Sequence, residues 1–311
     1  LVRYPTGGDW LLGRPSEDNV CRVGLRHGTT HLSRITAWTA GSLTQMQRDE
    51  IFVSDAVPAV QSQAFADEFT SLSLDVAENG SNNWVTRFVG WNTAVTSGNN
   101  DLCYKTHSGF VGGGSSALGV TLHEVSGGVL KLSAMPTPVG KEANVDSFPY
   151  VGGMISSELR HAQVYGYWEV RARFAVTKGQ HWSMYMLSTD EQWPPEIDMV
   201  EIAGWENTTG STLVTMNFHG APGETSNASQ VIFAPTSGPG NWHTYGFYWD
   251  QYDMIWYFDG VEKLRRPNFI SKPMYFLITP EMASNWPGQP NETTVWPSTC
   301  EVEYVRVDKF A

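Results

Sequence analysis

The chain has 311 residues, a formal net charge of −12 and only 17% charged residues. This acidic balance argues against nucleic acid and anionic membranes as partners, because both require a basic surface. The sequence contains no run of eighteen or more apolar residues, so we expect no membrane insertion.

The three cysteines, Cys21, Cys103 and Cys300, are odd in number and far apart in the sequence. They can form at most one intrachain disulfide, so we expect buried or free thiols. No cysteine and histidine cluster has the spacing of zinc ligands. Aromatic residues make up 13% of the chain, which suits both core packing and stacking on sugar rings.

The first 64 residues differ from the rest because they show no clear alternation of apolar and polar residues. We interpret residues 1–64 as an N-terminal extension or arm and residues 65–311 as the main domain. Within the arm, Ser42–Phe52 is the best helix candidate. Leu1–Pro5 lacks the apolar segment of a signal peptide, which says little about secretion because a mature or trimmed chain would look the same.

After residue 64, the dominant pattern is a period of two, interrupted by Gly, Pro and Asn. This pattern is typical of antiparallel strands with one buried face. The predicted strands include 120–125, 129–134, 167–176, 243–249 and 255–258. The last of them precedes Asp259-Gly260, a pair suited to a tight hairpin. Many short strands between turns predict an all-β sandwich.

Three carboxylates lie together in one predicted strand. Side chains alternate along a strand, so Glu196 and Asp198 share a face and Glu201 points to the other face. One extra residue in a β-bulge, at Met199 or Val200, would return Glu201 to the face of the other two acids. The sequence therefore predicts a bulge if the three acids act together.

Paired carboxylates suit the hydrolysis of a glycosidic bond, which needs a proton donor and a nucleophile or base. Two carboxyl groups about 5–5.5 Å apart do this with retention of configuration. A solvent-facing acidic strand and a calcium site are the alternatives. Three like charges on one strand face normally destabilise a sheet, and calcium sites usually draw their oxygens from loops.

The motif Glu-Ile-Asp-x-x-Glu after Trp-Pro resembles the signature of glycoside hydrolase family 16. The resemblance covers roughly residues 64–311, and its flanking motifs are 67–69, 165–171, 285–288 and 303–307. It implies a concanavalin-type jelly-roll β-sandwich of two antiparallel sheets. It also implies that Glu196 is the nucleophile, Glu201 the acid/base and Asp198 an assisting residue of a retaining endo-β-glycanase.

The same resemblance suggests residues that contact the substrate: Trp182, His219, Asn100, Arg87 and Trp205. It implies no required cofactor. Relatives often carry a structural calcium ion on an aspartate, and this chain has Glu303 in that place, so a structural calcium stays open.

Residues 67–74 and 193–196 resemble bacterial exopolysaccharide depolymerases of the succinoglycan type. Two departures from the family pattern, Met186 in place of a usual Trp and Thr279–Ser284 in place of small residues, are expected to border the cleft. A Met there would leave room for side chains on the substrate. We therefore expect a branched bacterial exopolysaccharide as substrate, with a β-1,3- or mixed-linked glucan as the alternative.

Functions of another class stay open, because one fold serves many functions. A carbohydrate-binding module uses the same jelly roll, and a virion or cell-surface structural protein would use residues 1–64 for attachment. We expect a secreted protein, carried in some settings on a cell surface or virion. Its expected partner is a polysaccharide.

Overall fold

The computed structural model describes residues 62–75, 81–88, 102–104, 115–204, 213–220 and 230–310, and two short strands nearer the start. The chain divides into two compact units, residues 1–59 and residues 60–311. In the first unit, β1 (Val20–Cys21) pairs antiparallel with β2 (Trp38–Thr39). The helix predicted over Ser42–Phe52 lies outside the described residues.

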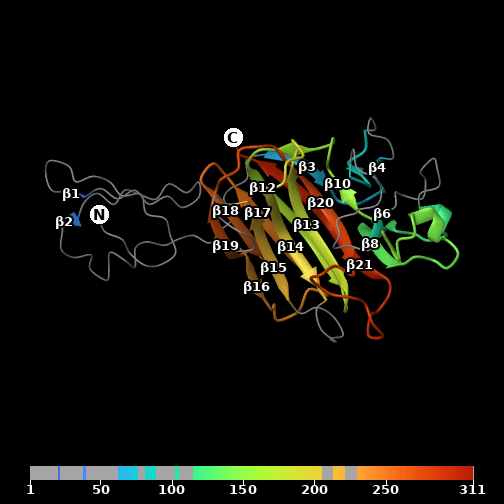
Figure 1. Ribbon diagram of the computed structural model, residues 1–311. Coiled ribbons are helices and arrows are strands. Elements are labelled where there is room, and N and C mark those ends of the chain that lie inside the picture. The colour runs from blue at the N-terminus through green and yellow to red at the C-terminus, as the bar shows by residue number, and fades with distance from the viewer. Residues whose placement is uncertain are drawn as a thin grey trace. The chain divides into compact units, whose positions relative to one another are not determined.

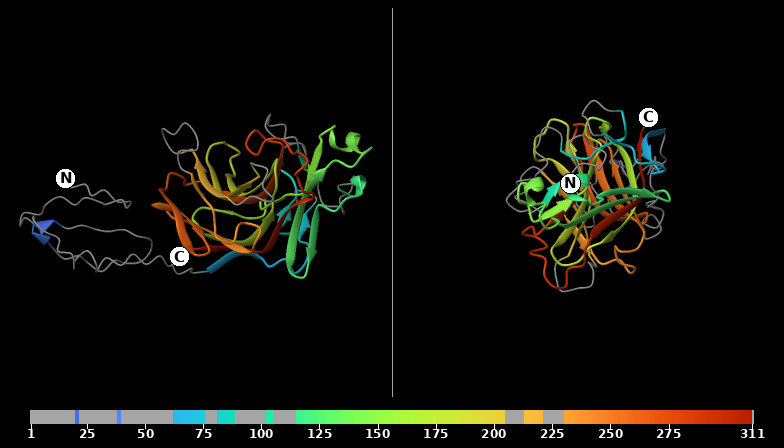
Figure 2. Two further views of the ribbon diagram at one scale, coloured as in Figure 1. Left: turned by 90° about the horizontal axis from the view of Figure 1, so that it is seen from below. Right: turned by 90° about the vertical axis from the view of Figure 1, so that its right-hand side faces the viewer.

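The second unit is a sandwich of two sheets, which Figure 1 and Figure 2 show from three directions. One sheet has nine strands, in the order β16 (Val231–Phe233), β15 (Val214–His219), β14 (Glu196–Ala203), β13 (Gln180–Ser188), β20 (Met274–Met282), β10 (Ile155–Ser156), β5 (Trp84–Val85) and β4 (Leu74–Asp75), with β11 (Ala162–Gln163) also on β20. This sheet carries the three acids of the sequence motif.

The other sheet has ten strands, in the order β19 (Val261–Pro267), β18 (Asp253–Phe258), β17 (His243–Trp249), β12 (Gly166–Ala175), β21 (Ser298–Lys309), β8 (Val129–Pro136), β9 (Tyr150–Gly152) and β6 (Leu102–Tyr104). In addition, β3 (Ser62–Asp67) pairs with β21, and β7 (His123–Ser126) pairs with β8. Two short 3₁₀ helices, η1 (Ser115–Leu118) and η2 (Glu142–Val145), lie in connections.

The predicted all-β sandwich is confirmed, and its pairings are antiparallel except for two short ones, β4 with β5 and β6 with β9. The predicted strand 167–176 is β12, whose alternate residues from Trp168 to Phe174 are buried. Asp259 and Gly260 both have positive φ, 49° and 74°, as the predicted β18–β19 hairpin requires.

The boundary predicted between residues 64 and 65 falls inside β3. Ser62 and Gln63 already pair with Lys309 and Asp308 of β21, so this strand starts before the predicted edge of the domain. The assignment of residues 1–64 as an arm and residues 65–311 as the main domain stays a prediction. Among the residues that the structure describes, no helix is long and apolar enough to cross a membrane.

The core lies between the two sheets and is rich in aromatic rings. Large side chains with almost no exposure come from both sheets, among them Trp84, Trp168, Trp182, Trp249 and Trp256. Such rings bury more apolar area than other side chains, which explains part of the aromatic surplus. The thiol of Cys300 is free and buried in this core, whereas the side chains of Cys21 and Cys103 lie outside the described residues.

Candidate active site

A β-bulge in β14 brings the three acids to one face. Opposite β13, Val200 pairs with Met184 and Asp198 pairs with Tyr185, so Met199 is the extra residue. The same shift appears opposite β15 between Asp198 and Glu201. Met199 and Val200 are both fully buried in the core. The predicted bulge is confirmed, and Glu201 consequently lies on the outer face of the nine-stranded sheet with Glu196 and Asp198.

Glu196 and Asp198 form one half of the site together with His219 of the neighbouring strand β15. Nε2 of His219 lies 3.1 Å from Oδ2 of Asp198 and 3.1 Å from Nδ2 of Asn217. The indole of Trp193 donates a hydrogen bond of 2.5 Å to Oε2 of Glu196. His219 was predicted from the sequence as a site residue, and the structure places it against Asp198.

The pKa values of the two acids in this half are raised to different extents. Burial raises the pKa of Asp198 well above its ordinary value, and the charges of Glu196 and Glu201 raise it further. Burial also raises the pKa of Glu196, but the hydrogen bond from Trp193, the charge of His219 and the hydrogen bond from Asp198 oppose that rise. Asp198 thus favours the protonated form more strongly than Glu196 does, and a hydrogen bond joins the two groups.

Glu201 forms the other half of the site with His181 of β13. Nε2 of His181 lies 3.5 Å from Oε1 of Glu201 and 3.0 Å from Oγ of Ser183. Nδ1 of the same ring lies 3.3 Å from Oε2 of Glu281 in β20. The two halves together present three carboxyl groups, two of them with raised pKa values, and two histidines.

Residues 117–306, more than half of the chain, match the family model of Glycosyl hydrolases family 16. The chain belongs to this family. The family is one of glycosyl hydrolases, enzymes that act on O-glycosyl bonds.

Two endo-1,3-1,4-beta-glycanases of Rhizobium meliloti are similar to this family 16 chain, at 29% and 28% identity over 80% of its length. The chain spans about half the length of these relatives, 52% of each. A glucan endo-1,3-beta-glucosidase A1 of Niallia circulans is 27% identical to this chain. The match spans 51% of this chain and 26% of that protein.

Solved structures share the family 16 fold. The laminarinase catalytic domain of Thermotoga maritima superposes with a TM-score of 0.63 at 21% identity, over 80% of this chain and 98% of that one. A non-specific endo-beta-1,3(4)-glucanase of family GH16 superposes with a TM-score of 0.64 at 22% identity, over 80% of this chain and 92% of that one. The predicted jelly-roll sandwich is thereby confirmed.

Two residues that were expected at the cleft lie inside the sandwich. Trp182 is fully buried, and its indole donates a hydrogen bond of 2.8 Å to Oγ of Ser298 in the other sheet. Met186 lies on the same side of β13 and is also fully buried. Trp182 therefore packs in the core in place of the predicted contact with substrate, and Met186 opens no space on the outer face.

The other predicted substrate contacts lie farther from the acids or outside the described residues. Arg87 follows β5, four strands from β14, or about 19 Å at the usual strand spacing. Asn100 and Trp205 lie outside the residues that the structure describes. The structure thus gathers Glu196, Asp198, Glu201 and His219 and leaves Arg87 apart from them.

The site also contains residues that the sequence did not single out. His181 of β13 contacts Glu201, and Glu281 of β20 contacts His181 from the far side. The rings of Trp193, beside Glu196, and Trp286, beside His181, are 65% and 37% exposed. Trp193 contacts His219, with ring centroids 6.0 Å apart, and Trp286 contacts His181, at 4.9 Å. Strand alternation could have suggested His181 only if the facing of β13 had been known.

No bound metal is needed to explain the positions of the acids. Donor atoms of Glu196, Asp198 and His219 lie within 4.8 Å of one another and could hold an ion. Metal ligation requires an ionised carboxylate, however, and burial raises the pKa of Asp198, which opposes that ionised form. Glu303, on which the calcium expectation rests, accepts a hydrogen bond of 2.5 Å from Nε of Arg171. A guanidinium in that place opposes a cation, so Glu303 does not fit a calcium ion.

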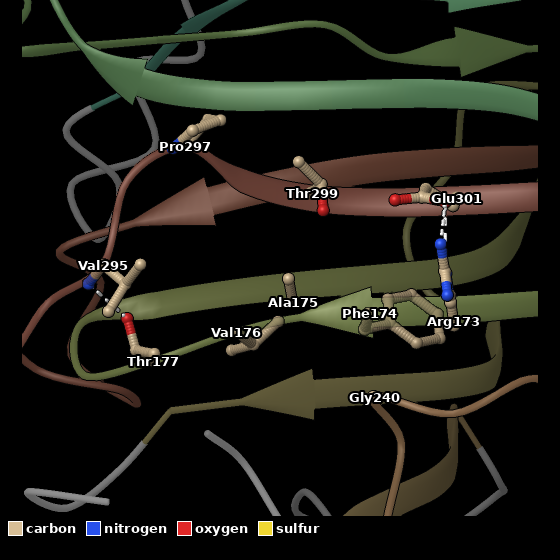
Figure 3. A pocket seen from close by; sticks show the side chains of 10 residues that line it. All are labelled: Arg173, Phe174, Ala175, Val176, Thr177, Gly240, Val295, Pro297, Thr299 and Glu301. Carbon is tan, nitrogen blue, oxygen red and sulfur yellow. Dashed lines mark hydrogen bonds and ion pairs between the residues drawn. The ribbon is translucent and has the colours of Figure 1, made fainter. Parts of the chain in front are cut away.

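A separate pocket of about 360 Å³ lies at the ends of β12 and β21 in the ten-stranded sheet (Figure 3). Its polar groups include an ion pair between Arg173 and Glu301, and Thr177 accepts a hydrogen bond from the backbone of Val295. None of the predicted site residues line it. The three acids of the sequence motif lie on the other sheet.

Proposed function

We propose that this protein is a retaining endo-β-glycanase that hydrolyses internal bonds of a polysaccharide. Glu196 is the nucleophile, Glu201 the acid/base and Asp198 the residue that holds the proton beside Glu196. The observation that carries this proposal is the bulge at Met199, because without it Glu201 would point into the core.

The protonation states support these roles. A nucleophile must be ionised, and Trp193 and Asp198 both donate hydrogen bonds to Glu196. In the first step, Glu196 attacks the anomeric carbon while Glu201 transfers its proton to the leaving glycosidic oxygen. In the second step, Glu201 takes a proton from water, whose oxygen replaces Glu196 on the same carbon. Two inversions restore the original configuration.

Internal cutting is supported by the two exposed indoles. Trp193 lies at the Glu196 end of the cluster and Trp286 near His181 and Glu201. Indole rings stack on sugar faces, so a polymer could be held on both sides of the bond that breaks. An enzyme that binds on both sides does not need a chain end.

For the substrate, we propose a β-linked polysaccharide with 1,3 and 1,4 linkages, because two relatives are described as endo-1,3-1,4-beta-glycanases. Branching of the substrate remains a narrower proposal. It now depends on the resemblance of residues 67–74 and 193–196 to exopolysaccharide depolymerases, since Met186 is buried and no longer supports it.

We further propose that the protein acts outside the cell on this polysaccharide partner, because polymers of that size do not enter cells intact. Protease treatment of intact cells that express the full-length protein tests this location. Loss of the protein from intact cells, or its presence in the culture medium, is expected.

The decisive experiment incubates the protein with laminarin, a mixed-linked β-glucan and branched bacterial exopolysaccharides, and records viscosity, reducing ends and the anomeric configuration of new ends. We expect a rapid fall in viscosity with few early reducing ends, and new ends in the β configuration. New ends in the α configuration would disprove retention. Cleavage of laminarin but of no branched polymer would disprove the proposal of a branched substrate.

A further inference from the structure

One imidazole lies between two glutamates of different strands. His181 is in β13, which has β14 on one side and β20 on the other. The register places His181 directly opposite Glu281 and places Ser183 directly opposite Glu201. Each ring nitrogen of His181 therefore faces a carboxylate, at 3.5 Å for Glu201 and 3.3 Å for Glu281.

The packing holds this ring in place. Trp286 meets it edge to face, at an interplanar angle of 87°, and Oγ of Ser183 lies 3.0 Å from Nε2. The His181 side chain is only 4% exposed, whereas the Glu281 side chain is 38% exposed. Only the doubly protonated imidazolium can donate hydrogen bonds from both nitrogens. A buried cation between two carboxylates is the arrangement that satisfies all three groups.

The electrostatics agree with this geometry. Burial alone would lower the pKa of His181, but the carboxylates of Glu201 and Glu281 outweigh burial and raise that pKa to about 9. The charged groups that face the ring from the adjacent strands are Glu201 in β14 and Glu281 in β20. The charge of Glu281 also contributes to the raised pKa of Asp198, so Glu281 belongs to the same electrostatic cluster as the acids.

We propose that His181 and Glu281 are positioning residues for the acid/base, with Glu281 holding the imidazolium so that its Nε2–H faces Glu201. This inference rests on the proposed function, since it assigns a task to the neighbours of Glu201. The cation stabilises the carboxylate that remains when the proton of Glu201 has gone to the leaving oxygen. His181 itself keeps both protons through the two steps, and Glu201 regains its proton from water.

The consequence concerns the transfer of the Glu201 proton. An opposite charge within about 4–6 Å stabilises the ionised form of a carboxyl. Without the cation, Glu201 would lie among Glu196 and Glu281 with no positive neighbour from β13. The carboxylate that forms on proton transfer would then be less stable, and poor leaving groups should be protonated more slowly.

The first arm of the test follows His181 directly by NMR titration of its imidazole in the full chain, and it does not require activity. In the wild type we expect His181 to titrate near pH 9, and in Glu281→Gln and Glu201→Gln at clearly lower pH. Titration of the wild-type ring near the ordinary value of 6.5 would overturn the proposal. An unchanged titration in Glu281→Gln would overturn the part assigned to Glu281.

The second arm measures kcat/KM against pH for the wild type and His181→Gln, with Glu301→Gln on the opposite sheet as a matched control. We expect the alkaline limb of the wild type to follow the deprotonation of His181 near pH 9, and His181→Gln to lack it. Its rate on the polysaccharide should fall more than its rate on a dinitrophenyl oligoglucoside, which needs little protonation. Glu301→Gln should keep the wild-type profile. If His181→Gln keeps the alkaline limb of the wild type and loses activity on both substrates equally, His181 is merely structural and the proposal fails.

Should His181→Gln fail to fold, Glu281→Gln supplies the same profile, because Glu281 is partly exposed and its amide analogue is isosteric. The alkaline limb of Glu281→Gln is expected to differ from that of the wild type, and identity of the two limbs would overturn the proposal. Failure of the proposed function gives a different result: wild type and Glu201→Ala would then hydrolyse the polysaccharides equally, whatever the titration of His181.

Discussion

Both sheets of the sandwich carry carboxylates on their outer faces, but the neighbours of these carboxylates differ. On the side of the ten-stranded sheet three glutamates have arginine partners: Glu303 with Arg171, Glu301 with Arg173 and Glu68 with Arg306. On the nine-stranded sheet Glu196, Asp198, Glu201 and Glu281 contact histidines, the Trp193 indole and one another.

The difference distinguishes glutamates in surface ion pairs from carboxyl groups that are arranged for chemistry. The paired glutamates of the ten-stranded sheet are 24% to 48% exposed, and pairs of this kind contribute about 0–1 kcal/mol each. The hydrogen bond from Arg306 lowers the pKa of Glu68. In the acid cluster, burial raises the pKa values of Glu196 and Asp198 instead. Perturbed pKa values of this kind cost stability, and active sites require them.

The largest effect is expected for Glu196→Gln, which removes the group proposed to form the covalent intermediate. Turnover should fall on the order of 10⁵-fold or more, as for other nucleophile deletions. In Glu196→Ala, azide can occupy the vacated space and attack directly, giving a glycosyl azide of inverted configuration. Rescue with retained configuration would mean that the roles of Glu196 and Glu201 are reversed.

Removal of the acid/base should have the next largest effect. Glu201→Ala is expected to lose roughly 10²–10⁴-fold in kcat/KM on the polysaccharide, the usual contribution of general acid catalysis. A dinitrophenyl glycoside leaves without a proton, so its glycosylation step should change little. Azide should then rescue the slow second step with retained configuration, as followed by product NMR. Equal losses on both substrates would contradict the assignment.

Asp198→Asn tests the buried proton through stability. Because the folded-state pKa of Asp198 is raised, the folded state binds more protons than the unfolded state above about pH 3.9. The wild type therefore loses up to about 1.4 kcal/mol per pH unit from this group as the pH rises through that window. Asparagine does not ionise, so the variant should gain stability relative to the wild type between pH 4 and pH 7. Urea titrations at both pH values measure this difference, and a constant difference would show that Asp198 is ionised in the fold.

The smallest effect is expected on the other sheet. Glu303→Gln leaves a hydrogen-bond acceptor for Arg171 and removes one partly exposed charge. Activity should stay within about twofold, and the free energy of unfolding should change by less than about 1 kcal/mol. If this variant lost much thermal stability, and if added calcium stabilised the wild type but not the variant, Glu303 would be a metal ligand after all.

Much of the fold follows from local patterns in the sequence. Alternation in residues 167–176 determines both β12 and its buried face, because one set of side chains is apolar and the other is charged. Spacing alone also required the bulge, since Glu196 and Glu201 are five residues apart. Both conclusions depend on residues that are close in the chain, where backbone geometry leaves few choices.

The facing of β13 could not be read in this way. Every residue from Gln180 to Met186 is buried, and both alternating sets contain apolar or aromatic side chains. The pattern therefore does not show which set meets the core. Only the pairing with β14 and β20 turned Trp182 and Met186 inward and His181 toward Glu201.

The sequence by itself determined the sandwich class, the acid motif and the need for a bulge. The tertiary structure decided which side chains complete the site, because Glu281 reaches His181 across 100 residues of sequence and His219 reaches Asp198 from another strand. The pKa values of the acids depend on burial and on these neighbours. Burial is a property of the packed sheets, and no single strand contains it.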